Sequence, residues 1–207
     1  MTDRSVAWGG LHNARDLGGL PAGTTVTRAG RVFRTPRLDG LDEQGWSELV
    51  DAGVRTIVDL RNPHEIEPLP LPAGVTRLHR PVEVWEDSEF MARWGEVLDS
   101  PEYYRANLAA WPELVVVHCS AGRDRTGLVT ALLLSLVGVP QETIVEDYAL
   151  AGLGAETGRA DDELAARLAE VTGHLRGFLA DLDVAEFLTV HGMSGDELTR
   201  VRARLLD

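Results

Sequence analysis

An apolar run leads directly into a glycine-containing loop and then into a second apolar run, and this order limits the folds open to the chain. Residues 114–118 read Leu-Val-Val-Val-His, a run typical of a strand buried on both faces. Residues 119–127, Cys-Ser-Ala-Gly-Arg-Asp-Arg-Thr-Gly, follow as the loop, and a buried helix is expected to begin near Thr126. A buried strand that passes through a short loop into a helix predicts an α/β domain.

The rest of the chain alternates predicted strands with predicted helices. Further strands are expected over residues 31–35, 56–60 and 75–82. Further helices are expected over residues 42–53, 140–148, 161–179 and 194–205. Asp42 is the expected N-cap and Gly53 the expected stop of the first of these, while Ser194 and Glu197 form a capping box for the last. No linker separates the elements, so we predict one domain over residues 1–207.

The charge of the chain argues against two classes of partner. It carries 33 acidic and 20 basic residues, a formal net charge of −13. A negative long-range field repels nucleic acid and anionic membranes, so neither nucleic-acid binding nor stable membrane association is expected. A small basic pocket remains compatible with this balance.

Cysteine usage and the apolar runs limit the chemistry and the location. Cys119 is the only cysteine, which excludes intrachain disulfides and zinc or redox motifs of the CxxC type. Residues 1–15 hold no apolar run of signal-peptide length, and the run over 128–139 is too short to span a bilayer. We expect a cytoplasmic protein, with export by a route lacking a signal peptide and the oligomeric state both left open.

The loop after the central strand has the composition of an anion cradle. Loop N–H groups and the N-terminus of the following helix converge on one spot, where they bind phosphate oxygens. Arg125 offers a planar fork of donors for two of those oxygens. The same positive environment favours Cys119 as a thiolate, which would attack phosphorus in line and form a cysteinyl-phosphate that water hydrolyses.

A structural interpretation of Cys119 competes with this chemistry. A lone cysteine after a valine-rich strand is usually a small buried hydrophobe. The combination of Cys119 with Gly122, Arg125, Thr126 and Gly127 at a strand-to-helix junction favours the catalytic interpretation.

The motif resembles the signature loop of the Cys-dependent protein tyrosine phosphatases; we call residues 118–127 the signature loop. With Asn-Ala-Arg-Asp-Leu-Gly-Gly at 13–19 and Asp-Leu-Arg at 59–61, the chain is similar to the bacterial branch that includes the mycobacterial phosphatase PtpB. The resemblance implies a protein-tyrosine-phosphatase-like fold with a mixed central sheet flanked by helices. It also implies no metal or cofactor, and hydrolysis of phosphotyrosine, sometimes of phosphoserine, phosphothreonine or phosphoinositides.

The resemblance also implies roles for single residues. Cys119 would be the nucleophile and Arg125 the phosphate-binding cation, while Thr126 would hydrogen-bond the thiolate and assist breakdown of the phospho-enzyme. His118 would tune the thiolate through the loop network, or would simply be a satisfied histidine at a strand end. The remaining loop positions would bind the substrate phosphate: Ser120, Ala121, Gly122, Arg123 and Gly127.

The general acid has several candidates. In the bacterial branch an Asp inside the signature loop is the candidate, and Asp124 occupies that position; it could instead accept backbone N–H bonds that order the loop. Asp59, at the end of a predicted strand, is the second choice and Asp16 the third. Trp-Pro-Glu at 111–113 resembles the acid loop of other tyrosine phosphatases, but it lies too close to Cys119 in sequence to be a separate loop.

Three further features have open interpretations. Arg123 stands where the branch usually has Lys, which leaves open how a second phosphate, as on an inositol ring, would be accepted. Arg15 and Asp16 either orient the signature loop and line the pocket edge, or form a structural salt bridge. The acidic, aromatic segment 83–112 is a candidate helical lid, with ordinary core packing as the alternative.

The leading hypothesis is a phosphomonoesterase of the tyrosine phosphatase type, of single or dual specificity, acting on a phosphorylated protein or phospho-metabolite. A phosphoinositide or other small-molecule phosphatase is the alternative, which the pair Arg123 and Arg125 keeps open. A non-catalytic phospho-ligand binding module would usually lack the nucleophile or the cation, and Cys119, Asp124 and Arg125 are all present. A thiol redox enzyme is disfavoured because no second cysteine could resolve an oxidised sulfur.

Overall fold

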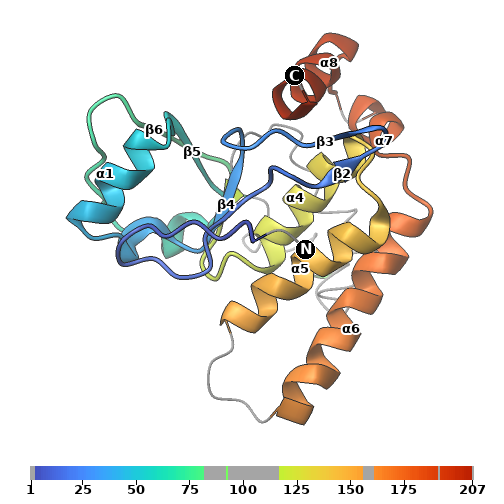
Figure 1. Cartoon of the computed structure of the whole chain (residues 1–207), viewed down its shortest axis with the longest axis horizontal. Helices are drawn as coiled ribbons and strands as arrows, with labels where there is room; N and C mark the ends of the chain where they lie inside the picture. Colours follow the sequence, from blue (N-terminus) through green and yellow to red (C-terminus); the bar gives the residue numbers. More distant parts are fainter. Residues whose placement is uncertain (1–2, 82–91, 93–116, 156–160, 191, 207) are drawn as a thin grey trace.

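The structure is a computed structural model of the whole chain (Figure 1), and it describes residues 3–81, 92, 117–155, 161–190 and 192–206. The candidate lid over 83–112 lies outside the described residues apart from Ala92, and so do residues 113–116 of the predicted central strand. The lid and the single-domain organisation therefore remain predictions.

A five-stranded mixed sheet forms the centre of the fold, in the order β1-β4-β7-β5-β6. β1 pairs antiparallel with β4, and the other pairs are parallel. The strands are β1 (Arg15–Asp16), β4 (Phe33–Thr35), β5 (Thr56–Asp59), β6 (Thr76–His79) and β7 (Val117–His118). β7 lies in the middle, where His118 is in register with Thr35 of β4 and with Asp59 of β5. A second, two-stranded sheet pairs β2 (Pro21–Ala22) with β3 (Thr25–Val26).

Helices cover both faces of the central sheet. The helices of the described residues are α1 (Glu43–Asp51), α4 (Asp124–Leu136), α5 (Gln141–Ala155), α6 (Asp161–Ala180), α7 (Val184–Val190) and α8 (Gly195–Leu206), with 3-10 turns η1 (Leu38–Gly40) and η2 (Pro63–Glu65). In Figure 1, α1 lies on one side of the sheet and α4, α5 and α6 on the other. Successive residues of β5 point to opposite faces, so Ile57 packs with Leu49 of α1 while Val58 packs with Val129 of α4. This arrangement confirms the α/β fold.

Helix ends follow the predicted capping signals. The Asp42 side chain accepts a hydrogen bond from the Gly45 N–H at 2.8 Å, and the chain leaves α1 at Gly53 with a φ of 85°. At the start of α8, the carboxylate of Glu197 accepts from the Ser194 N–H at 2.7 Å, which confirms the capping box. Arg15 and Asp16 form the two-residue strand β1, because they extend beside β4.

α4 is the buried centre of the helical layer. Nine of its residues are buried, so an apolar run without a polar face becomes a helix enclosed by sheet and helices. It begins at Asp124, two residues before the expected start, because the Gly127 N–H donates to the Arg123 carbonyl at 2.6 Å. Asp124 and Arg125 thus belong to its first turn. Among the described residues, no helix combines the length and apolarity needed to cross a membrane.

Candidate active site

The signature loop lies where the central strand β7 ends and α4 begins. The carboxyl end of a central parallel strand is the usual ligand position of open α/β sheets. Gly122 has a φ of 70°, and a Cβ built on it would lie 2.5 Å from the Thr35 carbonyl oxygen, so the crest of the loop requires glycine. The Arg37 N–H donates to the Ser120 carbonyl at 3.0 Å, which ties the loop to the chain after β4.

Cys119 is buried at the base of this loop. Its side chain packs with Val58, Leu60 and Val129 and is 3% exposed. Thr126, in the first turn of α4, is fully buried, and its hydroxyl has no hydrogen-bond partner among the described residues. A buried hydroxyl without a partner costs free energy, so this position needs a functional or structural explanation.

Arg125 is held by a carboxylate that sequence reasoning missed. Its guanidinium donates two hydrogen bonds to Glu65 at the end of η2, Nη1 to Oε2 at 2.5 Å and Nη2 to Oε1 at 2.8 Å. The Ser120 hydroxyl donates to Glu65 Oε1 at 2.7 Å. The hydrogen bonds from Arg125 lower the pKa of Glu65 to about 2, which keeps the carboxylate ionised. Glu65 thus fixes the direction of the Arg125 fork.

Asp124, the first residue of α4, belongs to the signature loop and has two donors on its carboxylate. Arg123 Nε lies 2.9 Å from Oδ1, and the Tyr148 hydroxyl of α5 donates to the same oxygen at 3.0 Å. The carboxylate is 29% exposed, so water reaches it. Asp124 therefore stands at the solvent-accessible edge of the site.

Asp59 and His118 lie beneath the site and are closed to solvent. Asp59 accepts from Arg61 Nε at 2.9 Å and from Arg61 Nη2 at 2.8 Å. Burial would raise the pKa of Asp59, but the hydrogen bonds from Arg61 and the proximity of His118 lower it overall. His118 Nε2 lies 3.5 Å from Asp59, Nδ1 lies 3.2 Å from the Cys119 carbonyl oxygen, and burial lowers the pKa of the imidazole.

Arg15 and Asp16 contact the loop's surroundings rather than its cradle. Arg15 Nη2 donates to the Asp147 carbonyl at 3.0 Å, and Nη1 donates to the Asn13 side chain. The Asp16 carboxylate accepts from the N–H groups of Gly18 at 2.9 Å and Gly30 at 2.6 Å. Asp16 thus orders the segment between β1 and β4.

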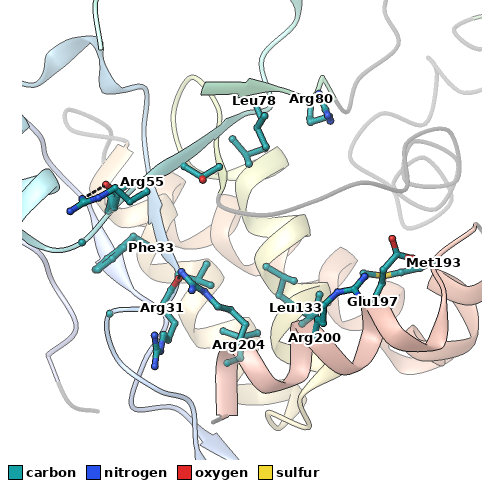
Figure 2. A pocket seen from close by; sticks show the side chains of 18 of the residues that line it. Arg31, Phe33, Arg55, Leu78, Arg80, Leu133, Met193, Glu197, Arg200 and Arg204 are labelled. Atoms are coloured by element: carbon teal, nitrogen blue, oxygen red, sulfur yellow. Dashed lines mark hydrogen bonds between the residues drawn. The ribbon is translucent and has the colours of Figure 1, made fainter. Parts of the chain in front are cut away.

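A cavity of about 800 Å³ lies apart from this site (Figure 2). Its lining comes from β4, β5, β6, α4 and α8, with Leu78, Leu133 and Arg200 among the side chains that Figure 2 labels. No residue of the signature loop lines it. Within the described part of the chain, no three or more His, Cys, Asp or Glu side chains gather as a metal site would require.

Comparison with known proteins decides the family. Residues 6–207 match the sequence pattern of the tyrosine phosphatase family. The chain belongs to this family. A Cupriavidus necator protein named for tyrosine-protein phosphatase activity is 29% identical over 170 residues, which are 69% of this chain and 61% of that protein.

A second relative is the triple specificity protein phosphatase PtpB of Mycobacterium tuberculosis, 28% identical over 185 residues, which are 67% of this chain and 66% of PtpB. A tyrosine-protein phosphatase of Nostoc commune is 56% identical over 36 residues, 17% of this chain and 12% of that protein. The matches to the first two relatives span less than two thirds of the length of either. Membership of the family confirms the resemblance inferred from the signature loop.

Proposed function

We propose that the chain is a phosphomonoesterase of the protein tyrosine phosphatase type that acts through a cysteinyl-phosphate. One arrangement carries the proposal: Cys119 directly follows the central strand β7, α4 begins at the other end of the same loop, and Glu65 fixes the fork of Arg125 in its first turn. A helix N-terminus and a guanidinium in the same loop as a cysteine favour both a bound phosphate and a thiolate.

The reaction has two balanced steps. In the first, Cys119 Sγ forms a bond to phosphorus while the ester P–O bond breaks, and the leaving oxygen takes a proton from a carboxylic acid. In the second, water attacks phosphorus, gives a proton back to that carboxylate, and the S–P bond breaks to return the thiolate. The Thr126 hydroxyl has no hydrogen-bond partner among the described residues, so it is available for its predicted hydrogen bond to the thiolate in this second step.

We assign the proton transfer to Asp124 rather than Asp59. Asp124 is partly exposed and belongs to the signature loop; Arg123 Nε lies 2.9 Å and 3.1 Å from its two oxygens, and the Tyr148 hydroxyl donates to only one of them. Asp59 is fully buried, and Arg61 occupies both of its oxygens. A buried carboxylate with a bidentate arginine partner has neither a proton to give nor access to the leaving oxygen.

The proposed substrates are phosphorylated proteins, with phosphotyrosine first and dual specificity as an extension. PtpB is named a triple specificity phosphatase, and Arg123 lies beside the site as a second cation, which favours testing phosphoinositides as the alternative. Cys119, Asp124 and Arg125 are all present, which argues against a non-catalytic binding module. The net charge of −13 argues against nucleic-acid binding and against stable membrane association.

Hydrolysis of para-nitrophenyl phosphate without added metal tests the mechanism. The wild type is expected to turn over, and Cys119→Ser to lose activity, because a hydroxyl is a far weaker nucleophile than a thiolate. Circular dichroism and thermal unfolding of both proteins provide the control for folding. Equal rates for the two folded proteins would rule out the proposed nucleophile.

Leaving-group dependence tests the acid. Asp124→Asn is expected to reduce turnover most on phenyl phosphates whose leaving groups are poor, because these need the proton most. Asp59→Asn serves as the matched comparison, and any loss of turnover in this variant is expected to be the same for all leaving groups. The opposite pattern would assign the acid to Asp59. A panel of phosphopeptides and phosphoinositides, run with the wild type, then ranks the substrate classes.

A further inference from the structure

Three arginines converge on a single buried carboxylate beneath the signature loop. Arg4 and Arg34 each pair with an oxygen of Asp147 in α5, and Arg15 Nε lies 3.6 Å from the same carboxylate. All four side chains are at most 6% exposed. We call these residues, Arg4, Arg15, Arg34 and Asp147, the Asp147 cluster.

Arg34 is the member of the cluster that touches the signature loop. Its Nη1 pairs with Asp147 Oδ2 at 2.5 Å, and its Nη2 donates to the Gly122 carbonyl oxygen at 3.0 Å. In the β4–β7 register, Arg34 lies opposite Val117, so the sheet itself places the guanidinium below the loop. One planar fork thus joins α5 to the crest of the loop.

This contact fixes the direction of a donor in the anion cradle. In a trans peptide the C=O and the following N–H point in opposite directions. A Gly122 carbonyl that is turned inward to Arg34 therefore turns the Arg123 N–H away from the cluster, toward the side where a phosphate would lie. This arrangement requires a φ of 70° at residue 122, which glycine adopts readily and residues with a side chain disfavour.

The cluster also leaves positive charge below the loop. Three guanidiniums face one carboxylate, and the Nε atoms of Arg4 and Arg15 are buried without a hydrogen-bond partner among the described residues. Burial, and then the charge of Arg34, lower the pKa of Arg15 to about 10, while Asp147 stays ionised with its pKa lowered to about 2. Charges in a buried environment are poorly screened, so their field extends to an anion bound above.

The same helix turn holds the other end of the loop. Tyr148, next to Asp147 in α5, donates to Asp124, and its ring would overlap a Cβ placed on Gly127. α5 thus contacts the crest of the loop through Arg34 and the start of α4 through Tyr148.

We propose that Arg34 is a positioning residue of the phosphate-binding loop, anchored by Asp147, that orients the Gly122–Arg123 peptide for oxyanion binding. The proposal rests on the proposed function in that the bound group is a phosphate. It concerns a residue that does not reach the substrate and that acts through the loop backbone.

Tungstate binding, measured by titration calorimetry in the Cys119→Ser protein, tests the proposal without turnover. Arg34→Met is expected to weaken binding about tenfold or more, because it removes a charge-assisted hydrogen bond that orients a cradle donor. The matched control is Arg4→Met. It removes the same charge from the same cluster, but the native Arg4 donates to the Asp16 carbonyl and not to the loop. A smaller change, of less than about threefold, is expected there, because Arg4→Met removes one charge of the cluster but no hydrogen bond to the loop.

Both variants leave Asp147 with two guanidinium partners, so neither creates an unpaired buried carboxylate. Arg34→Lys provides a second test that keeps the charge: a single ammonium cannot serve Asp147 and Gly122 at once as the fork does, so binding is again expected to weaken. Equal tungstate affinity in the Arg34 and Arg4 variants would overturn the positioning role while leaving the proposed function intact. A parent protein that binds no tungstate and a wild type without turnover would overturn both.

Discussion

Two groups of arginines lie in and beneath the signature loop, and they differ in exposure and in charge balance. Arg123 and Arg125 belong to the loop, and each pairs with its own carboxylate, Asp124 or Glu65, which stays 29% or 22% exposed. The arginines of the Asp147 cluster lie beneath the loop, share one carboxylate and are closed to solvent. Within the described part of the chain, each outer arginine has one carboxylate partner, whereas the three inner arginines share one.

The difference shows what each group can do. An ion pair that water reaches can exchange its carboxylate for a phosphate at low cost, because solvent stabilises the separated charges. A buried pair cannot make this exchange, because separation would leave a charge without a partner in a poorly polar interior. The outer arginines are therefore suited to bind substrate, and the inner ones to fix the backbone that binds it.

The largest expected effect is on stability, from Asp147→Asn. The substitution leaves three buried guanidiniums without a counter-charge, and we expect it to lower the free energy of unfolding by about 3–5 kcal/mol. Urea unfolding at neutral pH measures the change. Glu142→Gln is the control on the same helix, because its exposed pair with Arg176 should contribute little. Equal stability in the two variants would mean that the cluster is not a structural unit.

Arg125→Met is expected to reduce catalysis strongly, with a smaller loss of stability from the broken pair with Glu65. Loss of the guanidinium removes donors from the charge that develops on phosphate oxygens in the transition state, and kcat/KM should fall by about 10²–10³-fold. Steady-state kinetics with para-nitrophenyl phosphate measures this, with unfolding free energy as the control. Arg123→Met should lose less, because Arg123 pairs with the loop's own Asp124. A larger loss in Arg123→Met would reverse the assignment of the phosphate-binding cation.

The contribution of the outer pair Glu65–Arg125 to stability can be measured at acid pH. Its pKa in the folded chain is about 2, below its ordinary value of 4.5, so the ionised Glu65 stabilises the fold above about pH 4.5. This contribution is lost as the pH falls from about 4.5 toward 2, and for a partly exposed pair it amounts to about 2 kcal/mol. Glu65→Gln should therefore flatten the acid limb of the stability curve in urea unfolding. Superimposable acid limbs would show that the pair contributes nothing to stability.

The sequence predicted the elements that local signals specify. Capping residues such as Asp42 and Ser194 act within one helical turn, and the apolar run of α4 specifies burial without reference to distant partners. The signature loop was predicted on the same basis, because its nucleophile, cation and helix start lie within ten consecutive residues. Such features can be recognised in a single sequence because the interacting residues are neighbours in the chain.

The residues that hold the signature loop in place come from distant segments of the chain, and for this reason the sequence did not predict them. Glu65 lies sixty positions before Arg125, and Arg34 lies 113 positions before Asp147. An Asn-Pro-His-Glu pattern at 62–65 predicts a capped turn, but not which arginine its carboxylate will meet. The one available signal for Arg34 was its place in a predicted strand, since an arginine buried in a strand requires a partner.

The central claim is that Cys119 carries the phosphoryl group during turnover, and a trapped intermediate tests it most directly. The wild type is mixed with para-nitrophenyl phosphate, denatured rapidly during turnover, and examined by intact-mass and peptide mass spectrometry. The account predicts one added phosphoryl group, on the peptide that contains Cys119, and none in Cys119→Ser. A phosphoryl group on any other residue, or turnover by Cys119→Ser at the wild-type rate, would contradict it.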